Sequence, residues 1–577
     1  MRGQPTRLLA VVVLLGAVLL APRFGNVMLA ESQRNGDRDK SVFFPVVYMR
    51  PVQTTLDLHI THIGLYQSVQ NASNSVTLVA GKPALLRVYA QANAANPPAV
   101  AEVTVRAQRG QTNLGSLTLG PQVVPVSPSA GDLQSTFNFD LPHEWLSGDV
   151  TLSATIDAVN TVAEANESNN ERTERFAFRT ILPLNLTIVP IHYTHLPTGR
   201  VYAEAPHDPL SDWLRAAFPV GQVNVSYHTP FAFAGDLGNP NEWQRLLQEL
   251  TTLWAAEVGF GSGHVYYGLI PVGNGVSDAW FTGGVSGLGW IGQRVSVGLD
   301  LGEATGESAG HELGHNFGRR HAPCGNPSSV DPAYPYPNAT IGVYGVDTID
   351  DTLLAPNANY DMMSYCGPEW VSDYTYEGLL QDQLARGGRT GQKGQSLLLR
   401  ATLADGTVTA LPAYVLDQVS PSFAEAVGDY SAELLDESGN VVGAYPASLL
   451  ETEEAGVSAR MLVAQVSAAP EGANAARFVR GSEIMSQRAF AGADGQSQAQ
   501  RAAAGTLVRE GETLSLRWNN NHHALVRFSE DGQRWTIIAT DVTGGSFSLP
   551  LSHLPATSGY FQIVLADGGP TIALELK

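Results

Sequence analysis

The sequence predicts a multidomain protein of the α+β class, in which one α/β domain is flanked by β-sandwich domains. The first observation is length, because 577 residues correspond to about three to five domains. The second is that residues 45–180 and 395–577 contain short runs of alternating apolar and polar residues, as half-buried strands do. The third is that residues 181–392 alternate strand-like runs with runs of helical period, which indicates an α/β sheet.

Composition narrows the class of function. The formal net charge is −21, and no basic cluster is long enough to form a phosphate-binding face, so we expect no nucleic-acid partner. Charged residues make up only 15% of the chain and glycine is plentiful, which favours β-rich extracellular modules over helical cytosolic ones.

Residues 1–30 are predicted to be an export signal. Arg2 and Arg7 form its charged end, and the apolar run Leu8–Ala21 has the length of a signal core and is short for a membrane span. An uncleaved anchor is the alternative. Residues 31–44 then form a polar linker, and the protein is expected to be secreted or held at the cell surface.

Residues 45–180 are predicted to form an antiparallel β-sandwich, because Gly, Pro and Asn separate the short alternating runs. Their end, D-A-V-N-T-V-A-E-A-N-E-S-N-N at 157–170, resembles the closing hairpin of CARDB-type domains, immunoglobulin-like modules of bacterial surface and secreted proteins. The resemblance implies an N-terminal adhesion or spacer module. The candidate strands are Val76–Ala80, Ala84–Tyr89, Glu102–Ala107 and Val150–Ile156.

Residues 181–392 differ in pattern from the regions on either side. Four runs are predicted to be strands, and two runs with apolar residues three and four apart are predicted to be helices. Ser372 can cap a later helix, which Gly387 and Gly388 end. The predicted strands are Leu184–Ile191, Val223–Tyr227, Val265–Pro271 and Val295–Leu299, and the two helical runs are Leu210–Phe218 and Trp243–Trp254.

The motif H-E-L-G-H-N-F-G-R-R-H occupies residues 311–321 of this domain. His311 and His315 are four residues apart, so a helix places them on one face, where they can share a zinc ion. Gly318 can adopt the left-handed conformation that ends a helix, and the turn then brings His321 back as a third ligand. Three protein ligands leave one position for water, as in catalytic zinc sites. Glu312 is the predicted general base.

A second motif, Y-D-M-M-S-Y-C at 360–366, follows the first. Together they resemble the metzincin clan of zinc endopeptidases, in which HExxHxxGxxH precedes a methionine turn; H-E-L-G-H-N-F-G is similar to the reprolysin type and M-S-Y to the serralysin type. The resemblance implies a metzincin-like α/β catalytic domain, with Met363 in the turn and Tyr365 able to reach the metal or the developing oxyanion. It also implies that residues 283–292 hold an edge strand that pairs with extended substrate, although a glycine-rich hairpin loop fits that stretch equally well.

The chain has two cysteines, Cys324 and Cys366, and each follows one of the motifs. We expect a disulfide between them, because both flank the proposed metal site and the chain resembles a secreted protein; two buried free thiols are the alternative. Asp347, Asp350 and Asp351 could hold Ca²⁺, but a solvated acidic loop is the favoured interpretation.

Residues 395–490 are predicted to be a β-rich domain, residues 491–504 a linker or long loop, and residues 505–577 an immunoglobulin- or fibronectin-like sandwich. Trp518 and Trp535 are expected in the core of this last sandwich.

These features predict a secreted zinc-dependent endopeptidase that hydrolyses peptide bonds through a metal-activated water. The expected cofactor is one catalytic Zn²⁺, and the expected partner is a protein or glycoprotein substrate. We expect a monomer whose β modules associate with a cell surface. The alternative is a cell-surface adhesion or binding protein with an inactive metzincin fold, but the complete set of motif residues favours the enzyme.

Overall fold

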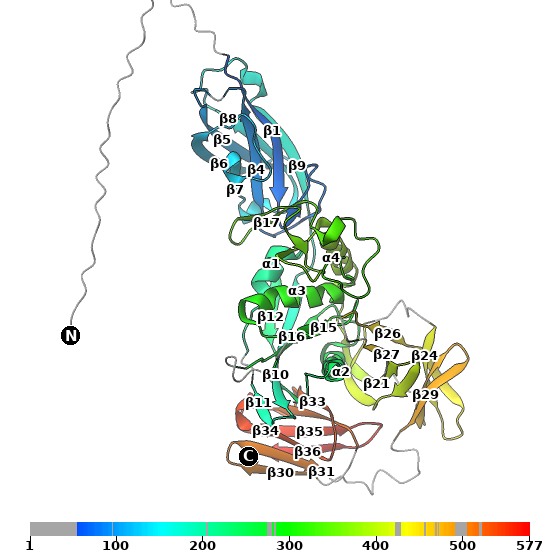
Figure 1. Ribbon diagram of the computed structural model, residues 1–577. Helices are drawn as coiled ribbons and strands as arrows, with labels where there is room; N and C mark the ends of the chain where they lie inside the picture. The colour runs from blue at the N-terminus through cyan, green and yellow to red at the C-terminus, as the bar shows by residue number, and fades with distance from the viewer. Residues whose placement is uncertain are drawn as a thin grey trace, which may run out of the picture. The chain divides into compact units, whose positions relative to one another are not determined.

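The computed structural model describes residues 55–577 apart from 95, 204–205, 274–279, 282–283, 422–428, 455–456, 458, 468–469, 471, 491–504 and 519–521 (Figure 1). The predicted signal at 1–30 and both predicted linkers, at 31–44 and 491–504, lie outside the described residues. Within the described part, no helix combines the length and the apolar character that a membrane crossing needs.

The fold is mostly β, and the predicted fold class is wrong in this respect. Strands account for 46% of the structure and helices for 15%, with four α-helices among the described residues. A metzincin-like α/β catalytic domain within an α+β protein is therefore not indicated, whereas the predicted β-sandwich domains fit. The reason is that the expected alternation of strands and helices is interrupted: β12 (Val223–Tyr227) and β13 (Phe231–Gly235) follow each other without a helix, and short strands and turns occupy 317–372.

Two sheets share one hydrophobic core in the first part of the described chain. The inward positions alternate along each strand, as in β8, where Val150, Leu152, Ala154 and Ile156 are buried. The strand orders are β1-β4-β7 and β3-β9-β8-β5-β6. The strands are β1 (Leu58–Tyr66), β3 (Leu78–Val79), β4 (Leu85–Ala92), β5 (Val100–Arg109), β6 (Thr112–Val123), β7 (Phe137–Asp140), β8 (Gly148–Ile156) and β9 (Glu171–Arg179).

A mixed sheet in the order β11-β10-β14-β16-β15 follows, and it supports the motif-bearing helix. The long central strand β10 runs parallel to β14, and it also pairs in parallel with β12 near its start and with β13 near its end. The edge strand β15 runs antiparallel to β16. The remaining strands are β10 (Leu184–His195), β11 (Arg200–Tyr202), β14 (Val265–Ile270), β15 (Gly287–Gly289) and β16 (Val295–Leu299). Strands β10, β12, β14 and β16 confirm the four strands predicted here.

The four helices are α1 (Ser211–Ala217), α2 (Pro240–Val258), α3 (Thr305–Asn316) and α4 (Asp373–Arg386). Each lies where a helical pattern or motif predicted it. The Asn239 side chain caps α2 by accepting a hydrogen bond from the Asn241 N–H, and proline begins the helix. The predicted cap of α4 is confirmed, because Ser372 Oγ accepts a hydrogen bond from the Thr375 N–H at 3.1 Å.

Short strands connect the helices in the second half of this region. They are β17 (Tyr344–Asp347), β18 (Thr352–Leu354), β19 (Tyr360–Asp361) and β20 (Glu369–Trp370). β17 also pairs with β2 (Val69–Gln70), so a strand from the first part of the chain completes this small sheet.

Four further sheets make up the rest of the described chain, drawn in yellow to red in Figure 1. Their orders are β22-β21-β27-β26 with β23 beside β21, then β25-β24-β28-β29, β30-β31-β34 and β33-β32-β35-β36. The strands of the first two are β21 (Gln392–Ala404), β22 (Thr407–Ala410), β23 (Tyr414–Val419), β24 (Tyr430–Leu435), β25 (Val441–Pro446), β26 (Ser448–Glu451), β27 (Arg460–Ser467), β28 (Ala475–Arg480) and β29 (Glu483–Ala489). Those of the last two are β30 (Gly505–Glu510), β31 (Thr513–Trp518), β32 (Ala524–Ser529), β33 (Thr536–Val542), β34 (Ser546–Pro550), β35 (Gly559–Leu565) and β36 (Thr571–Leu576).

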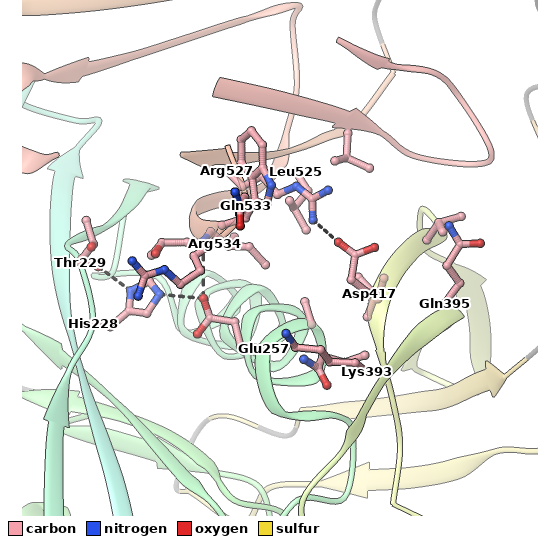
Figure 2. Close-up of a pocket in the computed structure, with 18 of the residues that line it drawn as sticks. His228, Thr229, Glu257, Lys393, Gln395, Asp417, Leu525, Arg527, Gln533 and Arg534 are labelled. Atoms are coloured by element: carbon pink, nitrogen blue, oxygen red, sulfur yellow. Dashed lines mark hydrogen bonds and ion pairs between the residues drawn. The ribbon is translucent and has the colours of Figure 1, made fainter. Parts of the chain in front are cut away.

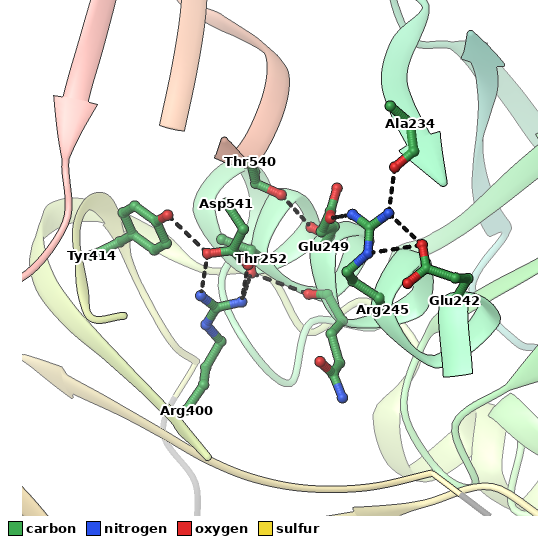
Figure 3. A network of polar contacts seen from close by, with 10 residues as sticks. Ala234, Glu242, Arg245, Glu249, Thr252, Arg400, Tyr414, Thr540 and Asp541 are labelled. Atoms are coloured by element: carbon green, nitrogen blue, oxygen red, sulfur yellow. Dashed lines mark hydrogen bonds and ion pairs between the residues drawn. The ribbon is translucent and has the colours of Figure 1, made fainter. Parts of the chain in front are cut away.

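A buried polar network links helix α2 to two of these later sheets (Figure 3). The Arg400 guanidinium on β21 makes two hydrogen bonds of 2.9 Å to the Asp541 carboxylate on β33, and it also donates to Thr252 Oγ1 on α2. The hydroxyl of Tyr414 donates to Asp541 at 2.8 Å. Because the Arg400 side chain is 0% exposed, its charge depends on these partners for compensation.

Candidate metal centre

Helix α3 carries the first motif, and its small residues allow two neighbours to approach closely. A Cβ atom at Gly310 would lie 2.1 Å from the ring of Trp213, and one at Gly314 would lie 2.2 Å from Met363 Sδ. Glycine at both positions therefore lets α1 pack on one side of α3 and the methionine turn on another.

The predicted exit from the helix is confirmed. Helix α3 ends at Asn316, and Gly318 has φ +76° while its N–H donates to the His315 carbonyl at 2.8 Å. This left-handed glycine turns the chain, and His321 consequently returns to the face that holds His311 and His315.

The three imidazole rings are held by the same kind of contact. Nδ1 of His311 contacts the Met362 carbonyl at 2.7 Å, and the Nδ1 atoms of His315 and His321 contact the carbonyls of Arg319 and Ser328 at 2.8 and 2.7 Å. A carbonyl accepts only, so each Nδ1 donates a proton to its carbonyl, and in the neutral ring each Nε2 has a lone pair for a metal ion. This second contact on each ring is typical of metal-binding histidines.

The three Nε2 atoms converge on one point, where they meet the carboxylate of Glu454. Glu454 Oε1 lies 3.3 Å from Nε2 of each histidine. The four potential ligand atoms all lie within 4.8 Å of one another. Nε2 of His315 and Nε2 of His321 are within hydrogen-bond distance of this oxygen, whereas Nε2 of His311 is buried without a hydrogen bond. Neutral rings that donate through Nδ1 have no proton on Nε2 to give the carboxylate, but a cation bound between the four atoms can hold them together. The group His311, His315, His321 and Glu454 can therefore hold a metal ion.

The methionine turn lies against this group. Met363 is buried, its carbonyl accepts from the Ala322 N–H at 2.8 Å, and the Tyr365 N–H donates to the Cys324 carbonyl at 3.0 Å. The buried Asp361 carboxylate accepts from the Met363 N–H at 2.9 Å and fixes the turn. Met363 thus packs beneath the helix, and it makes no contact suited to chemistry.

The predicted disulfide between Cys324 and Cys366 is present, with the two Cα atoms 5.7 Å apart. It joins the segment after His321 to the segment after Met363. The covalent link therefore fixes the two motif-bearing segments to each other.

Glu312 lies beside the histidines on α3, and its carboxylate faces the edge strand β15. A Cβ atom at Gly287 would lie 2.4 Å from Glu312 Oε1, so glycine leaves the space that this carboxylate fills. Glu312 Oε2 is buried and has no hydrogen-bond partner. Burial, reinforced by the Glu454 carboxylate, raises the pKa of Glu312 well above its usual range.

A cleft of about 540 Å³ opens next to the metal group. Glu454 and Tyr365 both line it, and the hydroxyl of Tyr365 donates to Glu454 Oε2 at 2.8 Å. Aromatic and apolar side chains line the remainder, among them Leu237, Trp243, Trp280 and Phe281.

Glu454 is the residue of this group that the sequence did not predict. It lies in the loop between β26 and β27, 133 residues after His321 in the chain, and one glutamate within E-T-E-E has no ligand signature. The predicted Ca²⁺ ligands do not form such a group within the described residues. The carboxylates of Asp347 and Asp350 instead accept hydrogen bonds from the backbone N–H groups of Ile349 and Thr352.

A larger cleft, of about 740 Å³, lies elsewhere, between α2, β23 and the strands β32 and β33 (Figure 2). His228 Nε2 contacts Glu257 Oε1 at 3.1 Å there; burial opposes the charged ring, but the glutamate outweighs it and raises the pKa of His228. Trp535 lines this cleft half-buried, with Arg527 over its ring, so its predicted core position is wrong, whereas Trp518 is buried as predicted. None of the motif residues lines this cleft.

Comparison with known proteins identifies one domain. The CARDB family model matches residues 99–174, so this part of the first sandwich, which contains β5 to β8, is a CARDB domain. The expectation of an N-terminal CARDB domain is wrong, because residues 1–98 precede the match. No curated protein matches the chain.

Three solved structures are similar to parts of the chain. The CARDB domain of a Pyrococcus furiosus protein, in complex with di-metal ions, shares 20% identity over 22% of this chain and 94% of that chain, with a TM-score of 0.15. A β-glucuronidase from Parabacteroides merdae shares 10% identity over 90% of this chain and 77% of that chain, with a TM-score of 0.15. A β-glycosidase from Bacteroides vulgatus shares 10% identity over 90% of this chain and 79% of that chain, with a TM-score of 0.15. At these TM-scores the likenesses carry no argument about fold or function.

Proposed function

We propose that this protein is a zinc-dependent hydrolase of peptide bonds, with His311, His315 and His321 as the metal ligands and Glu312 as the general base. The observation that carries the proposal is the convergence of three Nε2 atoms whose Nδ1 atoms all contact backbone carbonyls. The Glu312 carboxylate on the same helix, whose Oε2 atom is buried without a hydrogen bond, adds the group that such chemistry requires. The motif resemblance to the metzincin clan supports the same activity without depending on the fold class.

Each side chain has its own role in the proposed reaction. A zinc ion bound there would act as a Lewis acid on the substrate carbonyl and on water. Glu312 accepts a proton from the attacking water and returns it to the leaving amine. The Tyr365 hydroxyl is a donor for the oxyanion that develops on the carbonyl.

The substrate in this proposal is an extended segment of a protein or glycoprotein. Strand β15 is the terminal strand of its sheet and its three residues are buried beside the metal group, and a sheet edge can hold a peptide through backbone hydrogen bonds. The adjacent aromatic cleft would receive an apolar side chain. The disulfide favours an oxidising location outside the cytosol, which agrees with a secreted or surface-held enzyme.

A second candidate function is a surface binding protein in which the metal is structural. The specific observation in its favour is Glu454, because three histidines and a carboxylate make a closed four-ligand set. The CARDB domain would then serve binding, and no water would reach the metal.

The test is peptide hydrolysis by the full-length protein loaded with zinc, using a mixed peptide library and mass spectrometry of the new termini. Glu312→Gln should keep one zinc per chain and lose about 10²–10⁴-fold of the turnover, because the proton acceptor is gone. Glu307→Gln, an exposed position on the same helix, is the matched control and should not change the rate.

The assay is repeated in a Glu454→Ala background, because that carboxylate faces the histidines. Cleavage in either background that chelator abolishes supports the enzyme. Stoichiometric zinc without any cleavage in both backgrounds would favour the binding protein.

A further inference from the structure

The Glu454 carboxylate stands at the position of a fourth metal ligand. Its Oε1 atom is 3.3 Å from Nε2 of His311, of His315 and of His321. Four ligand atoms bound at about 2.0–2.1 Å around a tetrahedral metal are about 3.3–3.4 Å from one another. The three Oε1–Nε2 distances agree with a carboxylate oxygen at the fourth corner of such a site, which is the position that a catalytic site leaves to water.

The second carboxylate oxygen is held as well. Glu454 Oε2 accepts a hydrogen bond of 2.8 Å from Tyr365, the tyrosine that follows the methionine turn. One carboxylate thus contacts all three histidines and the proposed oxyanion donor at once. Neither water nor a substrate carbonyl can reach that corner while Glu454 remains there.

The segment that delivers Glu454 is anchored on both sides of the site. We call strands β26 and β27, together with the described residues 452–454 between them, the closing hairpin. The neighbouring Glu453 pairs with Arg320, and its carbonyl accepts from Ser328, whose own carbonyl contacts His321. Across the site, the Glu451 carbonyl accepts from the Ile291 N–H at 3.0 Å, just beyond edge strand β15.

The closing hairpin also contributes a side chain to the aromatic cleft. Glu454 lines the cleft together with Trp243 and Trp280, whereas none of the three histidines does, so a ligand seated there would contact the carboxylate and not the histidines. The hairpin comes from a sheet far along the chain, and no covalent bond ties it to the metal group. Its withdrawal exchanges one carboxylate oxygen for a water oxygen and breaks no covalent bond.

We propose that the closing hairpin is an autoinhibitory element, in which Glu454 acts as a removable fourth ligand that keeps the metal site latent. That the site is latent rests on the proposed hydrolase function, whereas the role of Glu454 as a metal ligand does not. The structure described here is then the closed form, and loss of the Glu454 carboxylate opens the site.

The experiment compares full-length wild type, Glu454→Ala, Glu454→Gln and Glu451→Gln, each loaded with Co²⁺ for visible spectroscopy and with Zn²⁺ for chelator competition. Glu451 lies on the same hairpin, but its side chain pairs with Arg460, so Glu451→Gln is the matched control. Wild type and control should share one Co²⁺ spectrum that sodium azide does not change. Both Glu454 variants should show a different spectrum, an azide-dependent shift and a loss of metal affinity of about tenfold or more.

The results separate this proposal from the proposed function. Identical Co²⁺ spectra and equal Zn²⁺ affinities in wild type and in Glu454→Ala would overturn the ligand role, whatever the peptidase activity. Azide access gained only in the Glu454 variants, with peptide cleavage raised at least about tenfold, supports both proposals. Azide access gained without cleavage supports the ligand role and overturns the hydrolase. Glu454→Gln serves as the folding control, because glutamine has nearly the shape of glutamate and removes the carboxylate with little change in packing.

Discussion

Breaking the ion pair between Arg400 and Asp541 should destabilise the protein strongly. The pair is bidentate at 2.9 Å, the Arg400 side chain is 0% exposed, and Tyr414 and Thr252 complete its hydrogen bonds (Figure 3). Asp541→Ala leaves a buried guanidinium without its counter-charge, which costs about 3–5 kcal/mol. With a urea dependence of about 2–3 kcal/mol/M, the transition should move down by about 1–2 M urea.

The assay is urea unfolding followed by tryptophan fluorescence, with hydrogen exchange of β21 and β33 to identify the transition concerned. Asp149→Ala is the control, because its partner Arg175 is 71% exposed and such pairs contribute less than about 1 kcal/mol. The double variant Arg400→Met/Asp541→Leu should recover most of the loss, since no charge then remains buried. A loss below about 1 kcal/mol in Asp541→Ala, or strictly additive single effects, would refute the reasoning.

Two further predictions concern other parts of the structure. Cys324→Ser should lower the free energy of unfolding by about 4 kcal/mol in the chain-entropy model, because the disulfide closes a loop with a sequence separation of 42. If oxidised and reduced wild type had the same thermal unfolding midpoint, this prediction would be wrong. Burial beside His553 lowers the pKa of His192 to about 4, below its usual 6.5, so the unfolded state binds more protons between these values. Stability should therefore fall as pH drops from 6.5 towards 4, by about 3 kcal/mol from this residue, and His192→Phe at saturating zinc should show a smaller fall in denaturation curves; equal falls would contradict the assignment.

Most local elements were predictable from the sequence, since their signals are local. The period of apolar residues predicted α2, the serine before α4 predicted its cap, and β12 and β16 have the predicted bounds. The fold class was not predictable in the same way. Strands β12 and β13 both pair with β10, one after the other, without a helix between them. This arrangement depends on the sheet that the two strands join, and no local sequence pattern predicts it.

The sequence by itself determined the three histidines, the neighbouring glutamate, the helix-ending glycine and the cysteine pair. Their spacing along one helix and its turn leaves few ways to arrange them, because a helix repeats every 3.6 residues and a left-handed glycine reverses the chain. Only the tertiary structure decided what stands opposite the histidines. Glu454 reaches them from a hairpin more than a hundred residues away, and a contact of that kind follows from how separate sheets pack rather than from any periodicity in the chain.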